Sequence, residues 1–229
     1  MSRKPKTARA APDMSLAADL ATPVAGVDEA GRGPWAGPLV AAAAILADHH
    51  AIEGLDDSKR LTLRRREALA EALEQAASDG HAAIGIAVIE AEEIDRLGLG
   101  RANDEAMRRA IAALDQSSLG APATVLVDGR RVPPGMRSPA RAIVGGDGLV
   151  SAIAAASILA KVTRDRLMET LDARHPGYGW ATNRGYGTAE HRSALERLGP
   201  TPQHRRCFRP VAEVCMGLRG GGQRQHIVV

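Results

Sequence analysis

The chain has 229 residues with a formal net charge of +3, and 45% of its residues are hydrophobic, 25% charged and only 2% aromatic. This length suits one domain with a buried core, and the slight basic excess permits a polyanionic partner without requiring one. Two cysteines, Cys207 and Cys215, are too few for a disulfide framework or a four-ligand zinc site and favour a cytoplasmic location, while the longest apolar run, residues 39–47, is too short to span a membrane.

The predicted elements alternate short apolar strands with helices, as in an α/β fold. Residues 1–21 combine basic and Ala/Pro character and are predicted to form a disordered tail. Strands are predicted over residues 24–27, 39–46, 82–89, 123–127 and 141–144, and helices over 63–77, 101–114, 150–173 and 189–198. Gly and aromatic residues become frequent after Pro176, so we predict a core over 22–175, a C-terminal helical extension over 176–216 and a flexible tail over 217–229.

Four carboxylates stand at or just beyond the ends of predicted strands: Asp28, Glu29, Asp128 and Asp147. Successive strand residues point to opposite faces, so Asp28 and Glu29 can share one site only if the strand ends or bulges there. If the strands are neighbours, the acids converge at one edge of the sheet, where they cannot all stay ionised without cations. Oxygen ligands without His or Cys favour Mg²⁺ or Mn²⁺, and two such ions about 4 Å apart would clamp a phosphodiester.

Two polar segments are candidates for phosphate contacts. The Gly-Arg-Gly sequence of residues 31–33 places the planar fork of Arg32 between glycines that let a ligand approach the backbone closely. Ser58 and Lys59 precede the predicted helix over 63–77 and could hold a phosphate near its N-terminus. The local sequence alone, however, favours a solvated helix face for these two residues.

An apolar strand that ends in Asp-Glu also fits the Walker B box of an NTPase or helicase. That interpretation requires a phosphate loop of the form G-x-x-x-x-G-K-[ST], and none of the lysines in this chain follows a glycine. A non-enzymatic nucleic-acid binder stays open, but it leaves four acids at strand ends unexplained, because they repel phosphate unless metal intervenes.

Five motifs, in order along the chain, resemble those of ribonuclease HII, the type 2 ribonuclease H. They occupy residues 26–40 (GVDEAGRGPWAGPLV), 57–61, 127–129, 157–165 (SILAKVTRD) and 185–191, and the resemblance runs from about residue 24 to residue 211. It implies an α/β ribonuclease H-like fold, with a five-stranded mixed sheet flanked by helices and a C-terminal helical extension. It also implies a metal-dependent endoribonuclease, a phosphodiester hydrolase that leaves 3′-hydroxyl and 5′-phosphate ends.

The expected substrates are the RNA strand of RNA–DNA hybrids and DNA duplexes with single embedded ribonucleotides, cut on the 5′ side as in ribonucleotide excision repair. On the family pattern, the catalytic and metal-binding acids are Asp28, Glu29, Asp128 and Asp147, which would hold two Mg²⁺ or Mn²⁺ ions. The expected substrate-binding residues are Gly31, Arg32, Gly33, Ser58, Lys59, Lys161 and Tyr186. Of these, residues 31–33 match the turn that reads the ribose 2′-hydroxyl and its flanking phosphates, and Tyr186 matches the aromatic that packs on the sugar at the RNA-to-DNA step.

Several residues depart from this pattern or leave alternatives open. The family usually has Lys-Gly before the fourth acid, where this chain has Gly145 and Gly146, and Arg141 could substitute for the missing lysine. Asp165 lies in mid-helix between two arginines and is interpreted as a structural ion-pair partner. His191 could order the loop of Tyr186 or sit satisfied in the core, and we favour the core.

We expect a monomer without a membrane partner. The enzymatic alternative is a type 3 ribonuclease H, which prefers hybrids and carries an additional N-terminal domain, for which we expect no room in the residues before Val24. The alternative outside enzymes is a non-catalytic nucleic-acid binding module of the same fold.

Overall fold

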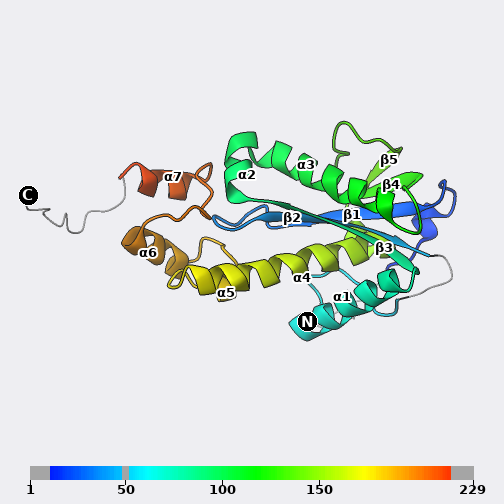
Figure 1. Cartoon of the computed structure of the whole chain (residues 1–229), viewed down its shortest axis with the longest axis horizontal. Helices are drawn as coiled ribbons and strands as arrows, with labels where there is room; N and C mark the ends of the chain where they lie inside the picture. Colours follow the sequence, from blue (N-terminus) through cyan, green and yellow to red (C-terminus); the bar gives the residue numbers. More distant parts are fainter. Residues whose placement is uncertain (1–10, 48–51, 218–229) are drawn as a thin grey trace, which may run out of the picture. The chain divides into compact units, whose positions relative to one another are not determined.

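A five-stranded sheet organises the structure, a computed structural model that describes residues 11–47 and 52–217 (Figure 1). Its strands are β1 (Val24–Ala30), β2 (Leu39–Leu46), β3 (Ala82–Ile89), β4 (Thr124–Asp128) and β5 (Ala140–Ile143). In space their order is β3-β2-β1-β4-β5, and β4 runs parallel to both β1 and β5. The mixed five-stranded sheet flanked by helices that the sequence led us to expect is confirmed.

Helices are found at each of the four predicted places, and further short helices occur between and after them. Within the described residues they are α1 (Leu63–Ser78), α2 (Ala91–Leu97), α3 (Leu99–Ala112), α4 (Ser151–Arg174), α5 (Trp180–Asn183), α6 (Ala189–Leu198) and α7 (Arg209–Cys215), with 3₁₀ turns over Ser15–Ala17, Ala113–Gln116 and Gly146–Gly148. The hydroxyls of Thr62 and Thr188 begin α1 and α6 by accepting backbone N–H groups of the first turn. None of the helices in the described part of the chain is long and apolar enough to cross a membrane.

Small residues let α4 pack closely on β1. A Cβ atom on Gly26 of β1 would lie 2.2 Å from the carbonyl carbon of Ala152, so the backbones meet where only glycine fits. The first turns of α4, residues 152–156, are fully buried. Figure 1 shows α1 and α4 on one face of the sheet and α3 on the other. The central strands are therefore buried on both faces, and polar side chains gather at the strand ends.

Part of the predicted N-terminal tail is packed rather than solvated. Residues 11–21 contain the Ser15–Ala17 turn, and the backbone of Asp13 donates to Leu149 and accepts from Ser151 at 3.2 and 3.0 Å. Met14, Ala17 and Leu20, spaced three residues apart, form an apolar side that packs in one cluster with the start of α4. The remainder of that tail, residues 1–10, and the predicted flexible tail beyond residue 217 lie outside the described residues.

The chain divides into two units by its internal contacts. The first comprises Met1–Ala30, Ala41–Ala87 and Asp104–Val162, and the second comprises Gly31–Val40, Val88–Asn103 and Thr163–Val229. The segment predicted as a C-terminal extension falls in the second unit, together with the turn that follows β1. Each unit carries one group of the predicted site residues.

Candidate active site

The acids of β1 lie within the strand rather than beyond its end. The strand extends to Ala30 instead of Val27, so the break that we expected between Asp28 and Glu29 is absent. The charge of Glu29 nevertheless raises the pKa of Asp28, so the two carboxylates interact although the strand continues through them. Asp28 is 6% exposed, and its Oδ1 accepts the backbone N–H of Glu29 at 2.7 Å. The strand pairs with β4 up to Val27 and Val127, which places Asp28 next to the end of β4.

A turn after β5 ties the fourth acid to the third. Asp128 is the last residue of β4, and its Oδ1 accepts the backbone N–H of Gly146 at 2.7 Å. Asp147 is the next residue and is 6% exposed. Gly145 has φ = 65°, in the left-handed region that glycine adopts at little cost. The glycine found in place of the family's lysine therefore suits the backbone of a turn that holds Asp147 near Asp128.

Burial and mutual repulsion make the ionised forms of these acids unfavourable. Burial raises the pKa of Asp28 well above its usual range, and the charges of Glu29 and Asp128 raise it further. The pKa of Asp147 is also raised, first by burial and then by the charges of Asp57 and Asp128. Because carboxylates repel one another in a low-dielectric site, a bound cation would relieve this cost.

The cation that faces Asp147 comes from the loop before α1. The Nζ atom of Lys59 lies 3.7 Å from Asp147 Oδ2, and the Lys59 side chain is 82% exposed. Partial burial lowers the pKa of Lys59, but the carboxylates around it, led by Asp147 and Asp57, outweigh that effect and raise it. Arg141, which we considered as a substitute for the missing lysine, is an exposed residue of β5. The positive partner of the fourth acid is thus Lys59.

Asp57 is a residue of this site that the sequence reasoning missed. The charge of its carboxylate raises the pKa of Asp147, so the two side chains interact. Its Oδ1 also accepts the backbone N–H of Lys59 at 2.9 Å, which fixes the start of the lysine side chain. The motif over residues 57–61 held the signal, but a polar loop before a helix does not indicate which strand end it meets.

Two serines support Asp28 from α4 and from the same loop. Ser58 Oγ and Ser157 Oγ lie 3.0 Å apart and are buried. The Ser157 hydroxyl lowers the pKa of the Asp28 carboxyl group and so favours its ionised form, against the larger effect of burial. Lys161 is half-buried one helical turn after Ser157, on the same side of α4. The structure thus brings Ser58 into contact with Ser157, the residue that acts on Asp28.

The donor set fits a hard divalent cation. Within residues 11–47 and 52–217, no three His, Cys, Asp or Glu side chains are already gathered tightly enough to ligate one ion. The acids nevertheless offer only oxygen atoms, interact through their charges and include two buried members, Asp28 and Asp147. Oxygen donors with excess negative charge suit Mg²⁺ or Mn²⁺.

In the second unit, the turn after β1 is held by a buried arginine of α4. Arg164 is 1% exposed, and its Nε donates to the carbonyl of Pro38 at 3.0 Å while its Nη2 donates to that of Ala36 at 3.3 Å. Gly31 has φ = 94°, and a Cβ atom there would lie 2.1 Å from Arg164 Nε. The first glycine of the Gly-Arg-Gly turn is therefore required by both its backbone conformation and its neighbour.

A second buried arginine holds the same turn. Arg205 donates through Nε to the carbonyl of Gly37 at 2.8 Å and through Nη1 to that of Arg32 at 3.2 Å. Burial lowers its pKa to about 9, so it stays charged at neutral pH. Because the C=O and N–H groups of a trans peptide point in opposite directions, the N–H of Gly33 points away from Arg205. The turn therefore presents a backbone donor on its other side.

Tyr186 packs against this turn. Its Cε1 lies 3.4 Å from the position that a Cβ atom on Gly33 would take, and the residue is 49% exposed. The preceding residue, Gly185, accepts the backbone N–H of Trp35 at 2.8 Å. The structure thus brings together Gly33 and the predicted sugar-contacting aromatic.

The predicted site residues fall into two groups. The first unit holds Asp28, Glu29, Ser58, Lys59, Asp128, Asp147 and Lys161, and the second holds Gly31, Arg32, Gly33 and Tyr186. Asp165 also lies in the second unit, where its Oδ1 is 3.7 Å from Arg184 Nε, as expected of a structural ion pair.

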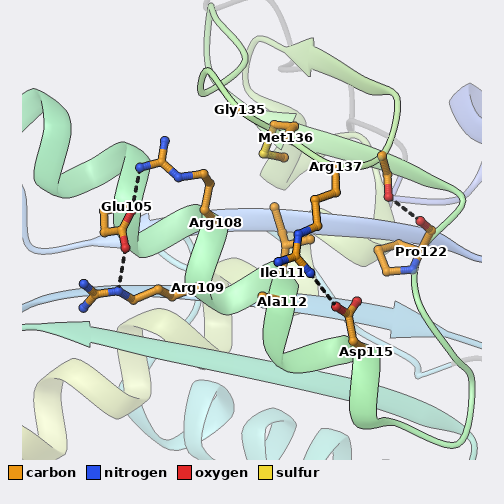
Figure 2. Close-up of a pocket in the computed structure, with 11 residues that line it drawn as sticks. Glu105, Arg108, Arg109, Ile111, Ala112, Asp115, Pro122, Gly135, Met136 and Arg137 are labelled. Atoms are coloured by element: carbon orange, nitrogen blue, oxygen red, sulfur yellow. Dashed lines mark hydrogen bonds and ion pairs between the residues drawn. The ribbon is translucent and has the colours of Figure 1, made fainter.

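The first unit also has a surface pocket of about 330 Å³, lined by α3 and by the loop before β5 (Figure 2). Three arginines line it, and each forms an ion pair with a carboxylate that also lines the pocket. Arg108 and Arg109 pair with Glu105, and Arg137 pairs with Asp115. None of the predicted site residues lines this pocket. Because its positive charges are paired within the pocket, it offers no comparable group of acids or bases for catalysis.

Known proteins are similar to this chain over most of its length. A family model described as Ribonuclease HII matches residues 25–211. The ribonuclease HII of Nocardia farcinica is 54% identical over 199 residues, covering 86% of this chain and 75% of that protein. The ribonuclease HII of Ruegeria pomeroyi is 51% identical over 207 residues, covering 89% of this chain and 85% of that protein.

Solved structures agree with the fold. The ribonuclease H2 of Pyrococcus horikoshii aligns with a TM-score of 0.71 and 29% identity, covering 86% of this chain and 98% of that one. Bst-RNase HIII in complex with Mn²⁺ aligns with a TM-score of 0.71 and 19% identity, covering 94% of this chain and 76% of that one. The ribonuclease H-like fold expected from the motifs is therefore confirmed.

Proposed function

The chain belongs to the ribonuclease HII family of RNA-hydrolysing nucleases, and we propose that it cuts the RNA strand of RNA–DNA hybrids and nicks duplex DNA on the 5′ side of single embedded ribonucleotides. The observation that carries the proposal is the group of acids at the ends of β1, β4 and β5, where Asp28 and Asp147 both interact with Asp128. Such nicking would begin ribonucleotide excision repair.

Asp28, Glu29, Asp128 and Asp147 would hold two divalent cations, Mg²⁺ or Mn²⁺, during catalysis. When bound, these cations supply activation of a water molecule and neutralisation of the charge on the leaving oxygen. The raised pKa of Asp28 supports this role, because an acid that repels its neighbours gains most from a cation.

The protein's own side chains orient the acids and the phosphate. Ser157 lowers the pKa of Asp28 and so favours its ionised form, which is the form that binds metal. The exposed ammonium group of Lys59 is free to turn toward a phosphate oxygen, since its stem is fixed at the backbone by Asp57. Water attack in line with the P–O3′ bond breaks that bond and leaves a 3′-hydroxyl and a 5′-phosphate.

Residues of the second unit would read the sugar. Gly33 presents its backbone N–H away from Arg205, and Tyr186 offers a half-exposed ring next to it. A donor beside an aromatic face suits recognition of a ribose 2′-hydroxyl followed by a deoxyribose, and the 2′-hydroxyl is the group that distinguishes RNA from DNA. The monomeric state and the cytoplasmic location stay predictions from the sequence.

The test is incision of a DNA duplex that carries one ribonucleotide, in Mg²⁺ or Mn²⁺, with the end groups of the products identified. We expect a nick on the 5′ side of the ribonucleotide, with 3′-hydroxyl and 5′-phosphate ends, and no cutting of the matched all-DNA duplex. Efficient cutting of the all-DNA duplex would overturn the proposal. Cutting of long hybrids alone would favour the preference of a type 3 enzyme, and binding without cleavage would favour a non-catalytic module.

A further inference from the structure

A pair of buried histidines lies directly behind the Tyr186 loop. His191, on α6, is 0% exposed, and His204 is 1% exposed. Their Nε2 atoms lie 3.1 Å apart, and the indole Nε1 of Trp180 lies 3.0 Å from the same nitrogen of His191. All three belong to the second unit, and none is among the predicted site residues.

The contacts of His204 determine which of its nitrogens carries the proton. Its Nδ1 accepts the backbone N–H of Thr201 at 3.0 Å, so this nitrogen has no proton. Burial lowers the pKa of His204 to about 3, and the ring is therefore neutral at physiological pH. A neutral imidazole has one N–H, so the proton of His204 is on Nε2 and is donated to His191.

The proton of His191 is fixed in turn. Its Nε2 faces two donors, the Nε2–H of His204 and the indole N–H of Trp180, and must be the acceptor nitrogen. Burial also lowers the pKa of His191, which leaves the ring neutral with its proton on Nδ1. That Nδ1–H group donates to the backbone carbonyl of Tyr186 at 2.9 Å.

The loop that carries Tyr186 is closed around this contact. The carbonyl of Tyr186 also accepts the backbone N–H of Thr188 at 2.8 Å, and the Thr188 hydroxyl accepts the N–H of His191 at 3.2 Å. On the other side, Gly185 accepts the N–H of Trp35 from the turn after β1. Of the two peptide groups that flank Tyr186, one is thus held by the imidazole of His191 and the other by the turn after β1.

We propose that His191 is a positioning residue for substrate recognition: with its tautomer set by His204, it holds the Tyr186 backbone so that the ring stands ready to pack on the substrate's sugar. This inference rests on the proposed contact between Tyr186 and the sugar. It differs from the expectation that His191 merely fills the core, because a core role requires burial and satisfied nitrogens but not a bond to this one carbonyl.

Two amide variants separate positioning from core packing. In His191→Asn, the amide nitrogen is attached at Cγ, as Nδ1 is, and can donate to Tyr186. In His191→Gln, the amide oxygen reaches the place of Nε2 and can accept from Trp180 and His204, but the donor to Tyr186 is lost. His191→Gln should therefore be the more stable variant, and His191→Asn the more active one.

The measurements are kcat and KM on the duplex with one ribonucleotide, together with the Tm of each variant. We expect kcat/KM to fall about tenfold in His191→Gln, the size of one lost hydrogen bond, and about threefold or less in His191→Asn. Activity that follows stability, with His191→Gln the better enzyme, would overturn the proposal. An NMR spectrum of the imidazole nitrogens that showed the proton of His191 on Nε2 would also overturn it.

A double-mutant cycle with Tyr186→Ala tests whether His191 acts through that ring. If it does, His191→Gln should cost little further activity once the ring is gone, and additive losses would contradict the proposal. An unchanged rate for Tyr186→Ala alone would refute the proposed sugar contact, and the positioning role with it. If Tyr186→Ala lowered kcat/KM as expected but His191→Gln and His191→Asn lowered it equally, the sugar contact would stand and the positioning role of His191 would be overturned.

Discussion

The acids at the strand ends and the turn after β1 are stabilised in opposite ways. Asp28 and Asp147 are buried beside other carboxylates, and their pKa values are raised because the fold leaves their charges poorly compensated. In the turn, the buried Arg164 and Arg205 donate to one backbone carbonyl after another. The comparison shows that the first region stores unfavourable electrostatic energy that a ligand can release, whereas the second is held by hydrogen bonds that form without a ligand, although Arg205 Nη2 is buried without a hydrogen-bond partner.

The largest effect should come from removing one acid. Asp28→Asn should lower kcat for cleavage by roughly 10³-fold or more, because a catalytic acid acts only as part of its group. The free energy of unfolding should rise, since the neutral amide no longer repels Glu29 and Asp128 and its oxygen can still accept the N–H of Glu29. Urea unfolding without metal checks this, with the exposed Asp19→Asn as control; a less stable Asp28→Asn would contradict the comparison.

Removing a brace from the turn should have the reverse outcome for stability. Arg205→Met should lower the free energy of unfolding by about 2–4 kcal/mol, because the carbonyls of Arg32 and of the buried Gly37 lose their donor. The neighbouring Arg206 is exposed, so Arg206→Met should change stability little. If both variants unfolded at the same urea concentration, the turn would not depend on the buried guanidinium.

Metal should stabilise the first region in the absence of any substrate. At a concentration about 100 times its Kd, Mn²⁺ should raise the free energy of unfolding by about 2.7 kcal/mol, because it binds the folded acids and not the unfolded chain. The rise should be smaller in Asp147→Asn and unchanged in Tyr186→Ala. Thermal unfolding with and without Mn²⁺ measures this, and an equal rise in Asp147→Asn would argue against that residue as a ligand.

The acids at the strand ends and the buried histidines of the second unit should also respond oppositely to acid. The pKa values of His191 and His204 are lowered by burial, that of His204 to about 3, so below pH 6.5 the unfolded chain binds protons that the folded chain does not. The free energy of unfolding should therefore decrease as the pH is lowered, by up to about 1.4 kcal/mol per pH unit for each imidazole. The raised pKa values of Asp28 and Asp147 act in the opposite sense, because there the folded chain binds protons first.

Urea unfolding between pH 7 and pH 5 separates these contributions. Asp28→Asn removes one stabilising response to acid, so its stability should fall more steeply than that of the wild type. His204→Asn removes one destabilising response, so its stability should fall less steeply. Identical slopes in all three proteins would show that these groups do not control the acid response.

The smallest effect should come from Lys59. Its side chain is 82% exposed, and the median contribution of a surface ion pair to stability is only about 0–1 kcal/mol. Lys59→Ala should therefore leave the Tm within about a degree of the wild type. KM should rise a few-fold, and its dependence on salt should become shallower because one phosphate contact is lost. Lys6→Ala, in the N-terminal segment, serves as a control; equal changes in both would indicate only general charge attraction.

Periodicity and turn residues predicted the strands and most helices, because each depends on residues near one another in the chain. The motifs also indicated the acids, which the structure places on neighbouring strands. Asp57 was not predicted, because its interaction with Asp147 joins residues that are distant in sequence. Arg205 was not predicted for the same reason. Nothing in its local sequence indicates that this charged side chain is buried, because its burial depends on carbonyl groups of a turn more than a hundred residues earlier. The packing of residues 11–21 likewise depends on α4.

Gly26 has no reactive group, yet the position of the acids depends on it. A Cβ atom at this position would lie 2.2 Å from the backbone of α4, so even alanine would push β1 and the helix apart two residues before Asp28. A random mutagenesis screen for inactive enzyme should therefore recover substitutions at residue 26 about as readily as at the acids. Ranking positions by loss of activity would place Gly26 among the catalytic residues, although its role is only to leave room for the backbone of α4.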